Sequence, residues 1–280
     1  MKILIENSKN YHYEILESII VKFPLILKLE DYNITLRIHK NKSYVNYISD
    51  KYPLINIEGY KSMCKYEEYD YIINATVYPL ELLEMEDRNN SYYILHDSLD
   101  YYEIGDNIID RCYNLTPLCK KSKLLECDIL PYSENKEIDE CIMIVQGNFN
   151  RRDIDLLEDI LLEDYGIEYK IRMIGRGELP VHIVNHPRIE YYVDLDFESY
   201  HKKFLDVYGI IPLITRENNG EYYLNKLTSS INYGKGYNLV FFVDKDLDDI
   251  YNLDRKIIYN RENVCDKFRE LLLRFNNKKI

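Results

Sequence analysis

The chain alternates short apolar runs with amphipathic stretches, and one stretch has the order strand, helix, strand. Apolar residues fill Ile210–Ile214 and Leu239–Val243, and a polar loop followed by Lys226–Ile231 lies between them. Short runs of β-branched and aromatic residues bounded by turn signals are typical of buried strands. We therefore predict a βαβ unit over Ile210–Asp244, with a helix that begins at Lys226. Strands joined through a helix run parallel, so the pattern restricts the chain to folds with parallel sheets.

The same alternation of strands and helices runs through the first half of the chain. Apolar runs predict strands at Lys2–Ile5, Ile34–Ile38, Tyr71–Val77 and Tyr92–Leu95, and a further one within Ile108–Leu115. Apolar residues spaced along one helix face predict helices at Tyr13–Phe23, which Pro24 should end, and at Ser43–Tyr52. We therefore predict a first Rossmann-like domain over residues 1–135.

A polar stretch at Pro131–Glu140 separates this half from a second half with the same pattern. Strands are predicted at Cys141–Val145, Tyr169–Ile174 and Glu190–Val193, and helices at Asp153–Asp164 and Phe197–Val207. Together with the βαβ unit, these elements predict a second Rossmann-like domain over residues 141–260. Residues 261–280 contain an amphipathic helix that we expect to pack across the domain junction. The chain is thus predicted to be an α/β protein whose two domains, each with a parallel sheet, face a cleft.

Composition narrows the range of functions. The formal net charge of -12 argues against a general nucleic-acid binder, which would carry a basic stripe. No run approaches the ~20 apolar residues of a membrane span, and the N-terminus lacks the regions of a signal peptide. The 6 cysteines show neither a CxxC pair nor a zinc spacing, so we expect reduced thiols and a cytoplasmic protein. The 29 tyrosines and the absence of Trp are typical of an AT-rich coding genome, such as that of a large DNA virus, whose product would act in the host cytoplasm.

Glycines and arginines follow two of the predicted strands in the second half. The first such loop contains Gly147, Asn148, Arg151 and Arg152, and the second contains Gly175, Arg176 and Gly177. Glycine permits a tight turn and the close approach of a ligand, and arginines beside a helix N-terminus can neutralise a diphosphate. The plain alternatives are a solvated arginine pair for the first loop and an ordinary turn for the second. The second loop lacks the third glycine of the dinucleotide fingerprint, which disfavours a nicotinamide-dependent oxidoreductase.

A lysine and three hydroxyls cluster at the predicted start of the helix in the βαβ unit. They belong to Lys226, Thr228, Ser229 and Ser230. A helix cap needs only one hydroxyl, so capping alone does not require this cluster. Free backbone N–H groups, hydroxyls and a cation at the carboxyl edge of a parallel sheet suit a phosphate. We therefore predict phosphate contact here, with simple capping as the alternative.

As an ordered set, these pieces make the second half resemble the donor-binding domain of GT-B-fold glycosyltransferases. The matching pieces are Gly147–Arg152, Gly175–Gly177 and Pro212–Asp244. The resemblance covers roughly residues 141–255 by pattern and the first half only by its alternation. It implies a transferase that needs no metal and no cofactor beyond a nucleotide-diphosphate sugar, with UDP favoured on base rates. The implied acceptor is a hydroxyl of a glycan or of a glycosylated protein.

Enzymes of this kind often carry an acidic motif ahead of the late helix, with Glu residues that contact sugar and ribose. Glu217 and Glu221 lie near that position and are the corresponding candidates. The chain departs from the pattern at the helix start, where it has Lys-Leu-Thr-Ser-Ser in place of the usual Glu-Ala.

Candidate general bases lie in the first half, where such enzymes usually bind the acceptor. His96 and Asp97 follow a predicted strand, and an imidazole with a pKa near 6.5 suits proton transfer at neutral pH. Asp97 can serve as the base instead, or can orient the imidazole. His12 and Glu14, beside the first strand-to-helix loop, form a second candidate set. The plain alternative for His96 and Asp97 is a surface turn.

Two alternatives stay open beside the transferase. An epimerase or hydrolase of the same fold would consume a sugar nucleotide without an acceptor. A non-catalytic binding module derived from this fold would recognise a glycan or a partner protein. A metal-dependent enzyme is disfavoured, because Asp194-Leu-Asp196 lies between a predicted strand and a helix, where linker carboxylates are the simpler interpretation. The oligomeric state is left open.

Overall fold

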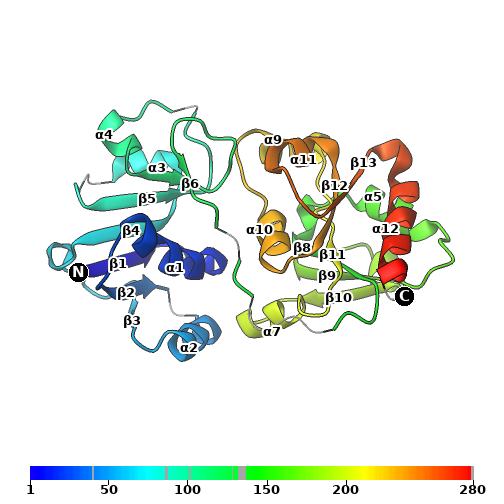
Figure 1. Ribbon diagram of the computed structural model, residues 1–280, viewed down its shortest axis with the longest axis horizontal. Coiled ribbons are helices and arrows are strands. Elements are labelled where there is room, and N and C mark those ends of the chain that lie inside the picture. The colour runs from blue at the N-terminus through cyan, green and yellow to red at the C-terminus, as the bar shows by residue number, and fades with distance from the viewer. Residues whose placement is uncertain (40, 86–87, 101, 128, 132–136, 279–280) are drawn as a thin grey trace. The chain divides into compact units, whose positions relative to one another are not determined.

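The computed structural model shows two α/β units, each built on one parallel sheet (Figure 1). It describes residues 1–39, 41–85, 88–100, 102–127, 129–131 and 137–278. By their contacts, unit 1 comprises Met1–Leu130 with Asn225–Leu227, and unit 2 comprises Pro131–Leu224 with Thr228–Ile280. The predicted fold class, two Rossmann-like domains with parallel sheets, is confirmed.

Unit 1 contains a sheet with the strand order β3-β2-β1-β4-β5-β6-β7, in which every neighbouring pair runs parallel. Its strands are β1 (Lys2–Asn7), β2 (Asn33–Ile38), β3 (Asn56–Gly59), β4 (Tyr71–Val77), β5 (Ser91–Leu95), β6 (Cys112–Asn114) and β7 (Lys123–Leu124). Its helices are α1 (Leu16–Ile26), α2 (Lys42–Lys51), α3 (Pro79–Glu84) and α4 (Asp106–Ile109), with single 3-10 turns η1 (Tyr13–Ile15) and η2 (Tyr66–Glu68). The strand order reverses between β1 and β4, and ligands of open α/β sheets bind at such a switch point.

Unit 2 contains a second parallel sheet with the order β10-β9-β8-β11-β12-β13. Its strands are β8 (Ile142–Asn148), β9 (Lys170–Arg176), β10 (Ile189–Val193), β11 (Gly209–Ile210), β12 (Val240–Asp244) and β13 (Lys256–Tyr259). Its helices are α5 (Ile154–Leu162), α6 (Val181–Val184), α7 (Phe197–Lys202), α8 (Arg216–Asn219), α9 (Glu221–Leu224), α10 (Ser229–Gly236), α11 (Lys245–Tyr251) and α12 (Val264–Lys278), with 3-10 turns η3 (Phe149–Arg151) and η4 (Arg261–Asn263). Here the order reverses between β8 and β11.

The prediction that Pro24 ends the first helix is wrong. Helix α1 contains Pro24 and continues to Ile26, and the N–H of Leu27 still donates to the Phe23 carbonyl at 3.0 Å. A proline inside a helix removes one backbone hydrogen bond. Packing compensates in this case, because Ile19 and Phe23 are fully buried on the sheet side. The proline lies close enough to the end of the helix that little of the helix depends on the missing bond.

Two details of the predicted βαβ unit are also wrong. The strand predicted at Ile210–Ile214 is only Gly209–Ile210, because Leu213 adopts a left-handed conformation (φ 49°) that no strand accommodates. The helix begins at Ser229 rather than at Lys226, and Thr228 occupies its N-cap position. Lys226 forms an isolated antiparallel bridge with Asp97 of unit 1 instead.

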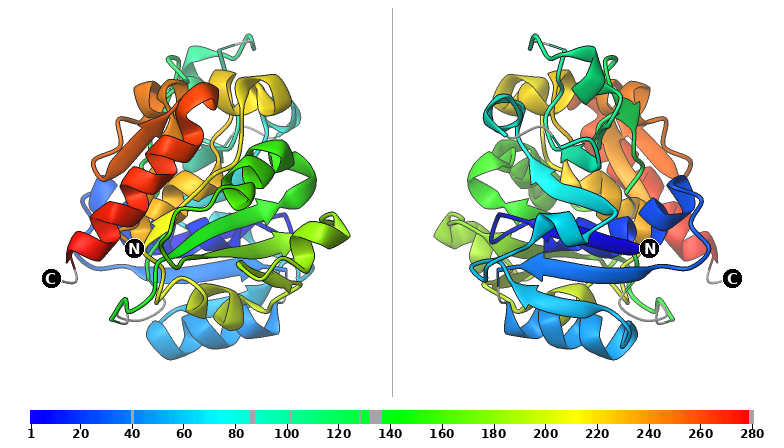
Figure 2. Two further views of the ribbon diagram at one scale, coloured as in Figure 1. Left: turned by 90° about the vertical axis from the view of Figure 1, so that its right-hand side faces the viewer. Right: turned by 90° about the vertical axis from the view of Figure 1, so that its left-hand side faces the viewer.

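Helix α12, red in Figure 2, packs against α5 and β13 within unit 2. Its buried residues Phe268, Leu271, Leu272 and Phe275 follow the spacing of one helix face and join the core of that unit. The predicted amphipathic helix therefore exists, and its apolar face packs against the core of unit 2. Within the part of the chain that the structure describes, no helix has the length and apolar character needed to cross a membrane.

Candidate functional site

The two predicted glycine loops of unit 2 lie side by side, because they end neighbouring strands. Gly147 at the end of β8 pairs with Gly175 of β9, and Asn148 pairs with Arg176. Both glycines have positive φ, and a Cβ on Gly175 would collide with the backbone carbonyl of Gly147. Only glycine fits there, since any side chain would push the two strand ends apart. The structure thus brings both predicted loops to one place on the sheet edge.

Arg152, at the end of the first loop, is only 9% exposed, and its guanidinium lies where a Cβ on Gly147 would be. Its Nη2 donates to the carbonyl of Gln146 at 2.5 Å, while its Nε has no hydrogen-bond partner. Among the residues that the structure describes, no carboxylate pairs with this guanidinium. Burial lowers the pKa of Arg152, which reflects the cost of holding an uncompensated charge away from water. A bound anion would stabilise a buried cation of this kind.

The start of α10 is connected to the same strand through the side chain of Gln146. This amide Nε2 donates to Ser229 Oγ at 2.9 Å and to Ser230 Oγ at 3.1 Å. The hydroxyl of Tyr200, on α7, donates to Gln146 Oε1 at 2.8 Å. Thr228, at the N-cap position, makes no side-chain capping bond, so the capping alternative does not explain the hydroxyls.

The other predicted donor residues are placed around these loops with differing contacts. Arg151 forms an ion pair with Glu221 at 3.2 Å, with its Nη1 also 3.3 Å from the Tyr222 hydroxyl. Asn148 accepts a hydrogen bond from the Asn150 N–H at 3.1 Å and so shapes the turn after β8. Arg176 and Glu217 are exposed. Of the two predicted sugar-contacting carboxylates, only Glu221 is therefore tied to the loop after β8 by a contact described here.

Of the two carboxylates considered as metal ligands, Asp196 has a structural role. Asp196 caps α7 by accepting from the Ser199 N–H and hydroxyl, each at 2.9 Å. Asp194 precedes it with a left-handed backbone (φ 53°). Over the described ranges, no group of three or more His, Cys, Asp or Glu side chains is arranged to hold a metal ion. Metal independence stays a prediction.

In unit 1 the two predicted sets of candidate bases lie together. His12 follows β1 and His96 follows β5, which flank β4 on either side. The ring centroids of the two imidazoles are 4.1 Å apart, with the planes inclined by 32°. Tyr11 contacts His12 edge-on at 4.8 Å, and Tyr78, which follows β4, lies 6.3 Å from His96. Sequence spacing alone did not indicate that these sets form one cluster.

The two imidazoles have different environments. His12 Nδ1 lies 3.0 Å from Glu14 Oε1. Burial acts to raise the pKa of Glu14, but the hydrogen bond and charge of His12 outweigh it and lower the pKa. His96 is only 8% exposed, its Nε2 has no partner, and burial, helped by His12, lowers its pKa to about 3. His96 is therefore neutral at pH 7 and shielded, whereas His12 is partly exposed and paired with a carboxylate.

Lys226 is grouped with this cluster rather than with the start of α10. It bridges to Asp97, and the neighbouring Ser98 N–H donates to the Asn225 carbonyl at 2.7 Å. Burial is the main cause of the low pKa of His96, and the Lys226 ammonium adds a small contribution in the same direction. The predicted phosphate contact of Lys226 assumed that this residue begins the helix, whereas the helix begins at Ser229.

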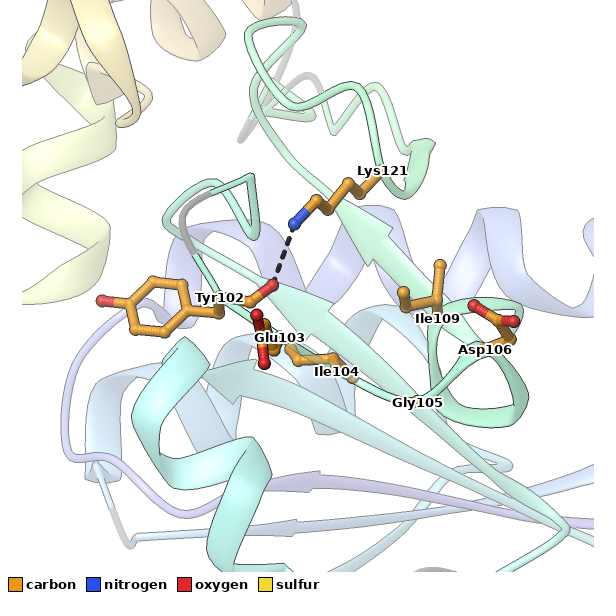
Figure 3. Close-up of a pocket in the computed structure, with 7 residues that line it drawn as sticks. All are labelled: Tyr102, Glu103, Ile104, Gly105, Asp106, Ile109 and Lys121. Carbon is orange, nitrogen blue, oxygen red and sulfur yellow. Dashed lines mark hydrogen bonds between the residues drawn. The ribbon is translucent and has the colours of Figure 1, made fainter.

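Two surface cavities of unit 1 contain none of the predicted site residues. One, of about 640 Å³, is lined by Tyr102, Glu103, Ile104, Gly105, Asp106, Ile109 and Lys121 (Figure 3). The Lys121 ammonium bonds another residue that lines this cavity, since its Nζ donates to the Tyr102 carbonyl at 2.9 Å. The other, of about 520 Å³, lies between α2 and the ends of β2 and β3 and is lined by Ile38, Lys42, Val45, Asn46, Ser49, Ile55, Ile57 and Glu58.

Sequence reasoning missed Gln146 and Tyr200. Gln146 is the single polar residue between the apolar run Cys141–Val145 and Gly147, and it is 2% exposed. An uncharged polar residue at the buried end of a strand needs hydrogen-bond partners, so its position is a usable signal. Tyr200 carries no comparable signal, because 29 tyrosines are spread along the chain.

Comparison with known proteins gives similarity in structure only. No family model and no curated protein matches the sequence. A glycosyltransferase from Rickettsia africae is 11% identical, with a TM-score of 0.53, covering 98% of this chain and 88% of that chain. A putative UDP-N-acetylglucosamine 2-epimerase from Listeria monocytogenes is 9% identical, with a TM-score of 0.53 and coverage of 97% and 88%. The UDP-GlcNAc 2-epimerase from Neisseria meningitidis, bound to UDP-GlcNAc, is 7% identical, with a TM-score of 0.52 and coverage of 98% and 92%. At such identities the likeness shows the fold, which is the GT-B arrangement of two Rossmann-like domains.

Proposed function

We propose that the protein is a glycosyltransferase that uses a nucleotide-diphosphate sugar. The observation that carries the proposal is Arg152, a buried guanidinium at the switch point of the unit 2 sheet that meets no carboxylate in the described part of the chain. Switch points of parallel sheets are where ligands bind, and a bound anion would offset the cost of burying a cation there. A diphosphate supplies that anion. Solved structures of this fold include one bound to UDP-GlcNAc, which makes UDP sugars the first donors to test.

The donor would lie on unit 2. Arg152, the glycine loops at Gly147 and Gly175, and the hydroxyl-rich start of α10 would surround the diphosphate, with Glu221 placed for the ribose or sugar. As the bond from the anomeric carbon to the diphosphate breaks, its electron pair passes to the leaving phosphate oxygen. Preorganised donors and positive charge stabilise that developing charge. No residue of this site requires a metal in the proposal.

The acceptor hydroxyl would be activated on unit 1, and we propose His12 as the base. Glu14 holds the Nδ1 side of the ring at 3.0 Å, so the Nε2 side is the one that takes the proton from the acceptor oxygen. The oxygen then forms the new bond to the anomeric carbon. Shielded His96 is poorly suited to this role, which reverses the order of preference drawn from sequence. The proposed acceptor is a hydroxyl of a glycan or glycosylated protein, and six free cysteines fit a cytoplasmic enzyme.

Donor binding is tested by thermal unfolding with UDP, GDP, CDP and dTDP sugars. A ligand at a hundred times its Kd adds ~2.7 kcal/mol to the unfolding free energy, so a true donor gives a clear rise in Tm. Turnover is then followed with and without glycan acceptors. Donor consumed without any acceptor would replace the transferase by a hydrolase or epimerase. Failure of every sugar nucleotide to bind would replace it by a binding module.

A further inference from the structure

Gln146 makes the hydrogen bonds that connect three parts of the unit 2 sheet edge. Its side-chain amide contacts Ser229 and Ser230 of α10 and Tyr200 of α7, and its main-chain carbonyl accepts from Arg152. At 2% exposed, it is itself out of reach of most ligands. Its effect must therefore pass through the residues that it holds.

Counting donors and acceptors shows what those bonds do to the serines. A serine hydroxyl has one proton to donate and two lone pairs that accept. The amide Nε2 of Gln146 has only protons to give, so each serine oxygen accepts from it at 2.9 and 3.1 Å. Their own protons must then point elsewhere. Ser230 is fully buried, whereas Ser229 is partly exposed and its proton has no acceptor within the described residues.

The amide orientation is set from its other end. The Tyr200 hydroxyl donates to Gln146 Oε1 at 2.8 Å. If the amide were flipped, its NH₂ group would face the Tyr200 hydroxyl proton, and two donors would meet unless the hydroxyl also rotated. Buried Arg152 donates to the main-chain carbonyl of Gln146, and its positive charge favours an anion at the same place. A bound anion would accept from the Ser229 hydroxyl and would also balance the Arg152 guanidinium, which meets no carboxylate among the described residues.

We propose that Gln146 is a positioning residue that presents the Ser229 hydroxyl as a hydrogen-bond donor to the diphosphate of the nucleotide sugar. The inference rests on the proposed function. It adds the residue that makes the Ser229 hydroxyl a hydrogen-bond donor toward the phosphate site. It assigns to Ser229 the direct contact, to Ser230 an anchoring role, and to Tyr200 the orientation of the amide.

The experiment is a double-mutant cycle between Gln146→Met and Ser229→Ala. Met nearly preserves the volume of Gln and removes the amide. Affinities for UDP, inorganic pyrophosphate and uridine are measured by calorimetry on the full chain. Each single variant should weaken UDP and pyrophosphate binding by about 10- to 150-fold, the range of a hydrogen bond to a charged group. The double variant should be no weaker than the worse single, because both changes remove the same contact. Uridine affinity should stay within about twofold, since uridine has no phosphate.

Tyr200→Phe provides a milder second variant, which leaves Gln146 in place and should weaken UDP binding by less than about fivefold. It keeps the inference testable should Gln146→Met fail to fold. Additive losses in the cycle, an unchanged UDP affinity in Gln146→Met, or a parallel loss of uridine affinity would each overturn the inference and leave the proposed function standing. Absence of UDP binding by the unchanged protein would overturn both.

Discussion

The two units have the same architecture but different charges at the carboxyl edges of their sheets. In unit 1 two basic groups near the switch point meet carboxylates, Lys9 with Glu81 and His12 with Glu14. In unit 2 the buried group at the corresponding place is Arg152, which meets none among the described residues. One edge therefore holds paired groups suited to moving a proton, and the other holds a buried charge that a bound anion would balance. The fold is common to both, and the side chains at the edge decide the chemistry.

The largest expected effect follows from removing the proposed base. His12→Gln should lower transfer by about 10²- to 10⁴-fold while the Kd for the donor stays unchanged. His39→Gln is a matched control, because His39 also follows a unit 1 strand and bonds the Ser8 carbonyl at 2.9 Å. The measurement is kcat beside donor Kd for each variant. A fully active His12→Gln would assign proton transfer to another group, with Asp97 next in line.

Arg152→Met probes the other side of the comparison. UDP affinity should fall by about 10- to 100-fold, the range of a lost charged contact. The stability of the ligand-free protein should stay equal or rise, because an unpaired buried charge has been removed. Arg172→Met is the contrast, since this buried arginine is paired with Glu190 and Asp206. That change should cost about 1–3 kcal/mol of stability, because Glu190 then keeps only Lys170 among the described residues, at 3.6 Å, and Asp206 loses its bond to the arginine. Equal stability losses in both variants would erase the proposed difference between them.

The pH dependence of stability should report on His96. Its pKa is lowered from 6.5 to about 3 in the folded protein, chiefly by burial. Between those values the unfolded chain binds a proton that the folded chain does not, so the unfolding free energy falls as the pH drops. The loss is at most about 1.4 kcal/mol per pH unit. His96→Gln should flatten the fall in Tm between pH 6.5 and 4.5. His186→Gln, whose pKa is also lowered by burial but which is partly exposed, should do so less.

The smallest expected effect is that of chelation. EDTA should leave transfer unchanged, because positive charge at the diphosphate would come from Arg152 and from the start of α10. Loss of turnover that Mn²⁺ or Mg²⁺ restores would show that the anion site of unit 2 is completed by a metal. Asp194 would then be examined first, since Asp196 is engaged in capping α7.

Strands at the centre of each sheet could be predicted because both faces are buried, which makes their sequences continuously apolar. β1, β4, β8 and β12 are of this kind. β3 and β13 escaped prediction, because an edge strand of four residues carries little pattern. The end of α1 was misjudged because the packing of Phe23 outweighs the local preference of Pro24.

The candidate site divides in the same way. The glycine loops were predictable, because glycine readily adopts the positive φ that Gly147 and Gly175 have, and its presence in the sequence indicates such a turn. The contact of His12 with His96 was not, because it depends on β1 and β5 lying on either side of β4. The placement of Lys226 failed for a related reason: its pairing with Asp97 joins residues far apart along the chain.

The segment Asn225–Leu227 belongs by its contacts to unit 1, although the chain on both sides of it belongs to unit 2. A ribosome releases the chain from its N-terminus, and domains fold as they emerge. The buried N–H of Ser98 therefore waits for the Asn225 carbonyl until most of unit 2 has been synthesised. An unpaired buried N–H is costly, so unit 1 should complete its folding late in translation. A chain stopped at Leu130 would lack this hydrogen bond. The part of the gene that encodes residues 1–130 therefore does not encode the whole of unit 1.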